Sequence, residues 1–110
     1  MKQAIKKPQE EYNLYNLIDP FLRYLSAVIK LSSITVKNYA SDIRHFTGWF
    51  NRYIAFVAEY EATSQAELLI LLTQKTIEEY RDSLIEGKIP FKSINRRLSS
   101  IRSFCAFAVS

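Results

Sequence analysis

The spacing of apolar residues constrains the fold of this chain more than any other feature of its sequence. In four segments the apolar residues recur at steps of three and four, which places them along one face of a helix. No alternating pattern typical of a β-strand competes with these segments. The sequence therefore predicts an all-α fold, and a chain of 110 residues suits a single domain with one core.

The first two predicted helices carry start signals. Asp19 can cap the first helix, with Pro20 at its first helical position, and Ser32 or Ser33 can cap the second. The core-facing residues of the first helix are Phe21, Leu22, Leu25, Val28 and Ile29. Those of the second, the longest helix, are Val36, Tyr39, Ile43, Phe46, Phe50, Ile54 and Val57.

The opposite face of the second helix is polar. It carries Lys37, Ser41, Arg44, Gly48 and, one turn further, Arg52. A glycine inside a helix costs about 1 kcal/mol relative to alanine. Gly48 therefore indicates either the close approach of another backbone or a ligand, or a tolerated surface position.

The third helix is predicted to begin at Thr73 or Thr76 and to end at Gly87, read as a left-handed stop. Its apolar residues are Ile77, Tyr80, Leu84 and Ile85, and its outer face carries Glu78, Glu79, Asp82 and Glu86. Acidic surfaces do not lie on phosphates, so we expect this helix to point away from any nucleic acid. Residues 58–72 before it are expected to form a loop, with room for one helical turn after Ser64, that returns to the core through Leu68–Leu72.

The fourth helix follows the break at Pro90, with Ser93 as its cap, and runs to about Val109. Its core side is predicted to carry Ile94, Leu98, Ile101, Cys105 and Ala108, with Arg97 and Phe104 at the edge. Its polar side carries Asn95, Arg96, Ser99, Arg102 and Ser103.

Charge is distributed unevenly along the chain. The net charge of +4 is modest, but the C-terminal 92–110 segment contains no acid beside Lys92, Arg96, Arg97 and Arg102. The preceding 61–91 segment is acidic. This asymmetry favours an anionic partner for the C-terminal segment, with a merely solvated basic face as the alternative.

Several kinds of chemistry are excluded by residue types that the chain lacks. One cysteine, Cys105, and one histidine, His45, leave no disulfide and no metal-ligand spacing, and two isolated glycines cannot form a phosphate-binding loop for a cofactor. Cys105 falls on a core side, so we assign no catalytic residue. The first ten residues lack the apolar stretch of a secretion signal, and no segment approaches the ~20 apolar residues of a membrane span. We expect a cytoplasmic protein.

Three motifs resemble those of one known family. The first consists of Ser32, Thr35, Tyr39, Asp42, Ile43 and Phe46, the second of Leu72, Thr73, Ile77 and Tyr80, and the third of Asn95–Ser99 with Ile101–Phe104. In this order they resemble the N-terminal core-binding domain of tyrosine recombinases of the phage-integrase type. The resemblance covers about residues 18–109, and the stretch between the second and third helices is longer than is usual in that family.

The resemblance implies an orthogonal four-helix bundle, the SAM-like core-binding fold, over residues 18–110, preceded by a flexible arm of residues 1–17. It also implies double-stranded DNA as the partner, held in a clamp between this domain and the parent's catalytic domain, which is expected after Ser110. In the family the second and fourth helices cross the major groove near the strand-exchange point, and the first helix contacts other recombinase protomers in the synaptic complex. Strand transfer uses a tyrosine of the other domain, so no tyrosine here is assigned that role.

The candidate DNA contacts lie on the polar faces of the second and fourth helices: Lys37, Ser41, Arg44, Asn95, Arg96, Ser99 and Arg102. Of these, Lys37, Arg44 and Arg96 are predicted to contact phosphates, whereas the α-helical positions 95, 99 and 102 can reach phosphates or bases. Arg97 can either join them or pack its stem at the core edge, with its guanidinium bonded to a helix end. Two other functions stay open: a helical interaction module that docks an acidic partner, and a helix-turn-helix regulator, although the connections are long for that motif.

Overall fold

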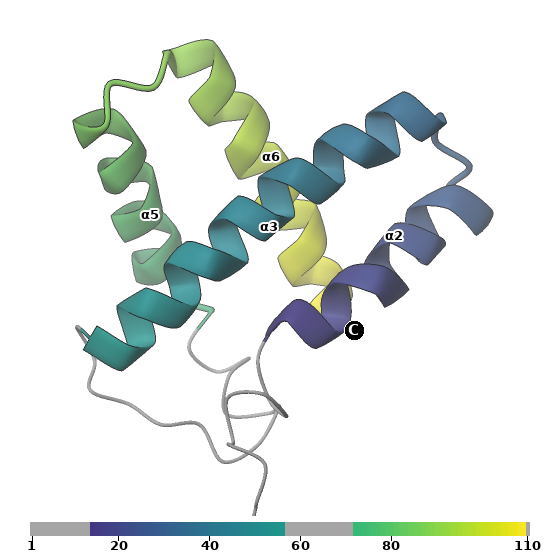
Figure 1. Ribbon diagram of the computed structural model, residues 1–110, viewed down its shortest axis with the longest axis horizontal. Coiled ribbons are helices and arrows are strands. Elements are labelled where there is room, and N and C mark those ends of the chain that lie inside the picture. The colour runs from purple at the N-terminus through teal and green to yellow at the C-terminus, as the bar shows by residue number, and fades with distance from the viewer. Residues whose placement is uncertain (1–13, 57–71, 110) are drawn as a thin grey trace, which may run out of the picture.

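The computed structural model describes residues 14–56 and 72–109, and within these ranges every regular element is a helix. A short 3₁₀ helix, η1 (Leu14–Leu17), precedes four α-helices: α2 (Ile18–Ala27), α3 (Ser33–Phe56), α5 (Gln74–Glu86) and α6 (Phe91–Ala108). Figure 1 shows α3 running across the front of the molecule and crossing α6, with α2 on one side and α5 on the other. The predicted all-α class is confirmed, and α3 is the longest helix, as expected.

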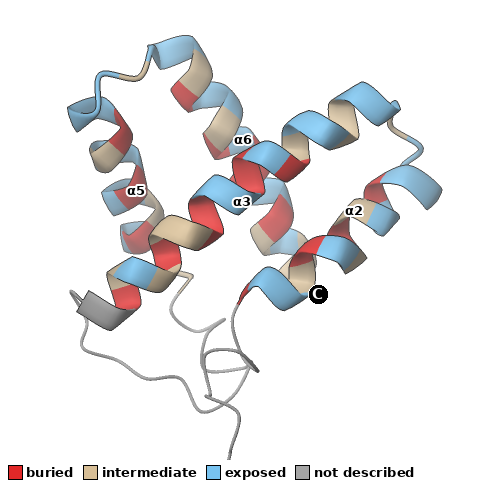
Figure 2. Cartoon of the chain, in the orientation of Figure 1, coloured by how far each residue is buried: buried red, intermediate tan, exposed pale blue. Residues whose placement is uncertain are grey.

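The core forms where the apolar faces of α2, α3, α5 and α6 meet (Figure 2). Phe21 of α2 lies edge-on to Phe104 of α6, with ring centroids 5.5 Å apart. Phe46 of α3 meets Tyr80 of α5 in the same way at 5.1 Å. Edge-to-face contacts of this kind add about 0.5–1.5 kcal/mol to the burial of the rings. Aromatic pairs therefore join the helices that lie far apart in the sequence.

Two of the predicted helix caps are confirmed. The Ser32 hydroxyl oxygen accepts a hydrogen bond from the Thr35 amide at 3.2 Å, so α3 begins at Ser33. The Thr73 hydroxyl oxygen accepts one from the Thr76 amide, also at 3.2 Å, and caps α5. Each bond satisfies one of the amide groups that a helix N-terminus leaves without a partner.

The N-terminal end of the domain differs from the prediction. The helix α2 begins at Ile18 with Leu17 as its cap, so Asp19 lies inside the first turn and the predicted cap is wrong. Leu14 is buried in the core, so the arm predicted over residues 1–17 is too long at its C-terminal end, and residues 1–13 lie outside the described residues.

The end of α2 also differs from the prediction. The helix ends at Ala27, Lys30 takes a left-handed conformation with φ 64°, and the Leu31 amide bonds to the Leu25 carbonyl. Val28 and Ile29 therefore lie beyond the helix and are exposed, although the sequence predicted them to face the core. The apolar stripe of α2 stops at Leu25 because the chain turns away there.

The helix α6 begins two residues before the predicted cap. Pro90, with φ −60° and ψ 144°, is its N-cap, and the first helical bond runs from the Ile94 amide to the Pro90 carbonyl at 3.0 Å. Ser93 lies inside the first turn and caps nothing, so that prediction is wrong. The extended conformation of the proline already provides the entry into the helix. Phe104, predicted at the edge of the core, is fully buried, whereas Cys105 is half-buried.

Gly87 ends α5, but not as a left-handed residue. Its φ is −77°, and the left-handed position is taken by Lys88 at φ 62°. The Ile89 amide bonds to the Leu84 carbonyl and the Lys88 amide to the Ile85 carbonyl. This pair of bonds is the Schellman pattern, in which the left-handed residue follows the cap. The predicted conformation of Gly87 is therefore wrong by one position.

Gly48 lies close to a side chain of η1. A Cβ atom at Gly48 would lie 3.2 Å from the Tyr15 hydroxyl, so a close approach does occur, although it comes from a side chain of η1 and not from a backbone or ligand. Most of the loop predicted over residues 58–72 lies outside the described residues; Leu72, at its end, packs against the core.

Candidate nucleic-acid interface

All of the predicted contact residues are exposed on the two helices that cross. Lys37, Ser41 and Arg44 lie on α3, and Asn95, Arg96, Ser99 and Arg102 lie on α6. On each helix these residues are separated by steps of one, three or four, which keeps them on one face. The two helices that carry these residues cross each other (Figure 1), and the buried residues of both belong to the shared core (Figure 2).

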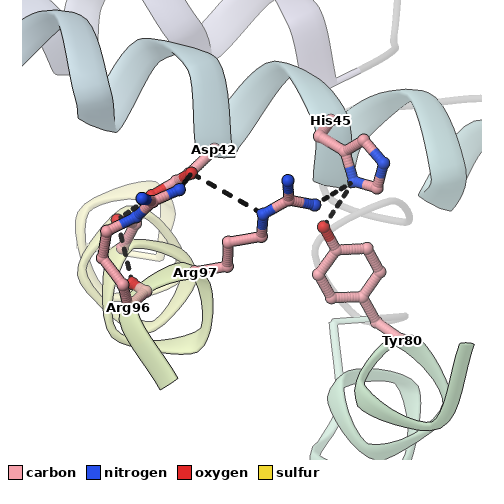
Figure 3. A network of polar contacts seen from close by, with 6 residues as sticks. Asp42, His45, Tyr80, Arg96 and Arg97 are labelled. Atoms are coloured by element: carbon pink, nitrogen blue, oxygen red, sulfur yellow. Dashed lines mark hydrogen bonds and ion pairs between the residues drawn. The ribbon is translucent and has the colours of Figure 1, made fainter. Parts of the chain in front are cut away.

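A buried carboxylate joins the two helices. Asp42 of α3 is only 2% exposed, and it accepts three hydrogen bonds from α6 (Figure 3). The Arg96 guanidinium donates two of them, from Nη2 to Oδ1 at 2.8 Å and from Nε to Oδ2 at 3.2 Å. The Ser100 hydroxyl donates the third, to Oδ2 at 2.9 Å. The two-pronged Arg96 contact has the geometry in which arginine binds a carboxylate most strongly.

The ion pair gives Arg96 two roles. Its side chain is 55% exposed, so it still reaches the surface, yet its charge is balanced by the carboxylate beneath it. The hydrogen bonds to Asp42 raise the pKa of the Arg96 guanidinium. Arg96 therefore adds donors to the polar face but little net charge, which the sequence alone did not reveal.

Sequence reasoning missed Asp42 as a structural partner, although a signal was present. Asp42 follows Tyr39 by three residues and precedes Phe46 by four, and both of these lie on the apolar stripe of α3. A carboxylate at that helical position must be buried, and buried carboxylates need a cation nearby. Arg97, predicted at the edge of the core, was the basic residue of α6 nearest to its core side.

Arg97 lies between Asp42 and His45 and takes part in a second group of polar contacts. Its Nε is 4.0 Å from Asp42 Oδ1, and its Nη1 is 3.5 Å from Nδ1 of His45 (Figure 3). Nδ1 of His45 is also 2.6 Å from the hydroxyl of Tyr80, which belongs to α5. The side chain of Arg97 is mostly buried, as one interpretation predicted, but its guanidinium faces α3 side chains instead of a helix end.

This arrangement shifts the acid–base equilibria of the two aromatic groups in opposite directions. Partial burial, together with the Arg97 and Arg52 cations, lowers the pKa of His45 below its ordinary value, although the residue is exposed. Burial raises the pKa of the Tyr80 hydroxyl. Near neutral pH both groups are therefore uncharged.

The surface charge of α3 and α6 follows from the burial of Asp42. That aspartate is the only acid on either helix, whereas their basic residues are Lys37, Arg44, Arg52, Lys92, Arg96, Arg97 and Arg102. The acids of α5, by contrast, are all exposed: Glu78, Glu79, Asp82 and Glu86. The acidic outer face predicted for this helix is present, and the two crossing helices present cations without an exposed carboxylate.

Other kinds of site find no support in the described part of the chain. No group of three histidine, cysteine or acidic side chains there could hold a metal ion. Burial raises the pKa of the Cys105 thiol to about 11, which makes it a poor nucleophile. None of the described helices is long and apolar enough to cross a lipid bilayer.

The described residues define a class: a small all-helical domain in which two crossing helices, α3 and α6, carry exposed cations and no exposed acid, a charge pattern found in nucleic-acid-binding domains. More specifically, the chain belongs to the family of phage integrase N-terminal SAM-like domains, whose family model matches residues 18–110. The predicted family and the SAM-like all-α fold are thus confirmed. Searches of curated proteins and of solved structures gave no match.

Proposed function

We propose that the chain is the DNA-binding part of a tyrosine-type site-specific recombinase or integrase and clamps duplex DNA near the strand-exchange site. The observation that carries this proposal is the charge of α3 and α6, whose only acid, Asp42, is buried and paired with Arg96. Every exposed charge on these helices is therefore positive. Membership of the integrase family supports recombination as the context.

The proposed contacts follow from the chemistry of each exposed side chain. Lys37 and Arg44 supply positive charge for phosphates, because the nearest acid on their helix is already neutralised. Arg96 supplies hydrogen-bond donors, since Asp42 balances its charge. On α6 the remaining contacts are Asn95, Ser99 and Arg102, whose side chains suit phosphates or base edges. Ser41 lies between Lys37 and Arg44 and suits a phosphate oxygen.

The family context extends the proposal beyond this chain. We propose that the DNA is enclosed between this domain and a catalytic domain of the same parent protein, and that other recombinase protomers join it in a synaptic complex. Strand cleavage and transfer then belong to that other domain. A cytoplasmic location suits a DNA partner and a single reduced thiol, Cys105.

Titration of the chain with duplex DNA at several salt concentrations tests this proposal. If about four to six phosphates are neutralised, log K should fall with log salt at a slope of roughly −4 to −5. Arg44→Ala should weaken binding and make the slope shallower by about one unit. Lys75→Ala is the matched control, because Lys75 is an exposed cation on the acidic α5 and its loss should leave binding unchanged.

Two results would contradict the proposal. Binding that is undetectable at low ionic strength, or independent of salt, would favour a helical interaction module with an acidic protein partner. Equal losses from Arg44→Ala and Lys75→Ala would show that binding follows net charge and not the α3–α6 face. Arg96 is unsuitable as the first probe, because its removal leaves Asp42 buried without its main partner.

A further inference from the structure

His45 lies where three helices meet. It belongs to α3, its Nδ1 is 2.6 Å from the Tyr80 hydroxyl of α5, and the same atom is 3.5 Å from Nη1 of Arg97 on α6. Tyr80 is fully buried, whereas His45 is exposed. One edge of the imidazole is therefore held by the interior of the domain, and the rest of the ring faces outward (Figure 3).

The neighbours of Nδ1 determine where the imidazole carries its proton. A guanidinium has only N–H donors and no acceptor, so the contact with Arg97 requires Nδ1 to accept. The Tyr80 hydroxyl then donates to the same atom. A proton on Nδ1 would also face the positive charge of Arg97. Geometry thus selects the neutral tautomer with its hydrogen on Nε2.

Nε2 lies on the side of the ring that faces away from Tyr80 and Arg97 (Figure 3). Along α3, His45 follows Ser41 by one helical turn and precedes Arg52 by two, so the three share the exposed face of the helix. The Nε2–H group is consequently an uncharged donor with a fixed direction, on the same face as Ser41, which is already proposed to contact DNA. None of the contacts that hold the ring uses it.

We propose that His45 is a further DNA-contact residue, that its Nε2–H donates a hydrogen bond to a phosphate oxygen of the duplex, and that Tyr80 and Arg97 position the ring for this bond. This inference rests on the proposed DNA-binding function. A phosphate oxygen is the expected acceptor because most protein–DNA hydrogen bonds go to phosphates and sugars. Since the donor is neutral, the contact adds affinity without adding to the salt dependence.

Two amide substitutions test the proposal, because each places a polar group at the position of only one of the two imidazole nitrogens. His45→Asn places its amide where Nδ1 lies and removes the distal donor, and we expect a three- to tenfold weaker affinity for duplex DNA, about the contribution of one hydrogen bond. His45→Gln reaches the position of Nε2 with an N–H group and should bind within about twofold of the parent chain. Neither change should alter the salt slope.

The tautomer itself can be measured directly, because His45 is the only histidine in the chain. The ¹⁵N NMR spectrum of the side chain should show Nδ1 without hydrogen and Nε2 with hydrogen at neutral pH. Tyr80→Phe removes the hydroxyl but keeps the ring that packs against Phe46 and Trp49, so it should shift the tautomer equilibrium and weaken DNA binding without loss of helix by circular dichroism.

The possible results separate this inference from the function beneath it. If Arg44→Ala weakens binding while His45→Asn binds as tightly as the parent chain, the DNA-binding function stands and the role of His45 is refuted. A hydrogen on Nδ1 in the parent chain would also refute it. If the loss of DNA affinity caused by His45→Asn varies among duplexes of unrelated sequence, the acceptor is a base edge and not a phosphate oxygen. That result would overturn this part of the proposal.

Discussion

Removal of Arg96 should destabilise the domain far more than the loss of an exposed arginine normally does. Arg96→Ala deletes two of the three hydrogen bonds to Asp42, whose carboxylate is 2% exposed. Breaking a fully buried ion pair costs about 3–5 kcal/mol. Here the arginine is 55% exposed, so water can enter its place, and both Ser100 and Arg97 remain near the carboxylate. These two effects reduce the expected cost to about 2 kcal/mol.

Urea unfolding, followed by circular dichroism and by the fluorescence of the single tryptophan, measures this cost. In thermal unfolding, the same loss of 2 kcal/mol should lower the melting temperature by about 8–16 °C in a domain of this size. Arg102→Ala is the matched control, because it removes an exposed arginine of the same helix and should change stability by no more than about 0.5 kcal/mol.

A second variant shows whether the cost comes from the orphaned carboxylate. Adding Asp42→Asn to Arg96→Ala removes the uncompensated charge, so the double variant should be more stable than Arg96→Ala alone by about 1 kcal/mol. If Arg96→Ala and Arg102→Ala lose equally little stability, the Asp42–Arg96 pair does not hold α3 and α6 together, and the reasoning fails.

Three further predictions follow from other parts of the structure. Lys88→Gly should stabilise the domain by about 0.5–1 kcal/mol in urea unfolding, because Lys88 holds a left-handed conformation at φ 62°. Gly87→Ala should cost nothing, because Gly87 has φ −77°. A clear loss of stability from Gly87→Ala would instead favour the left-handed conformation that the sequence predicted for Gly87. The free energy of unfolding should fall on acidification from pH 6.5 downward, because the pKa of His45 is lowered in the folded chain and the unfolded chain then binds more protons. His45→Gln should reduce the dependence of the unfolding free energy on pH. An equal pH dependence in both chains would contradict the lowered pKa of His45. The Cys105 thiol, with a pKa of about 11 against an ordinary 9.0, should react with a disulfide reagent at pH 8 about a hundredfold more slowly than an exposed thiol, and equal rates would show that it is not buried.

The parts of the fold that the sequence predicted are those set by local periodicity and local capping. The stripe of α3 and the caps Ser32 and Thr73 depend on residues within one or two turns, so they could be recognised without the structure. The errors occur where the chain turns. Val28 and Ile29 continue the apolar spacing of α2 but lie beyond its end, because the turn at Lys30 is not encoded by any glycine.

In the candidate site too, local features could be predicted from the sequence and contacts between helices could not. Which residues of α3 and α6 are exposed could be predicted from the helical positions alone. The partners Asp42 and Arg96 are 54 residues apart in sequence, and Tyr80 and His45 are 35 apart. Such contacts depend on how the helices cross, which no local pattern specifies. Arg96 was therefore predicted as a charge on the surface, whereas the structure makes it the partner of a buried carboxylate.

Asp42 links the stability of the domain to the proposed binding face. An ion pair to a buried carboxylate rarely adds stability beyond that of a well-packed apolar pair, so its presence at a helix crossing needs another explanation. The pair hides the one negative charge of α3 and α6 from an approaching phosphate. Its two-pronged geometry also fixes two atoms of α6 against two of α3, which apolar contacts do not do. The proposed function requires α3 and α6 to present their donors at a fixed separation, and the Asp42–Arg96 bonds hold the two helices together at their crossing.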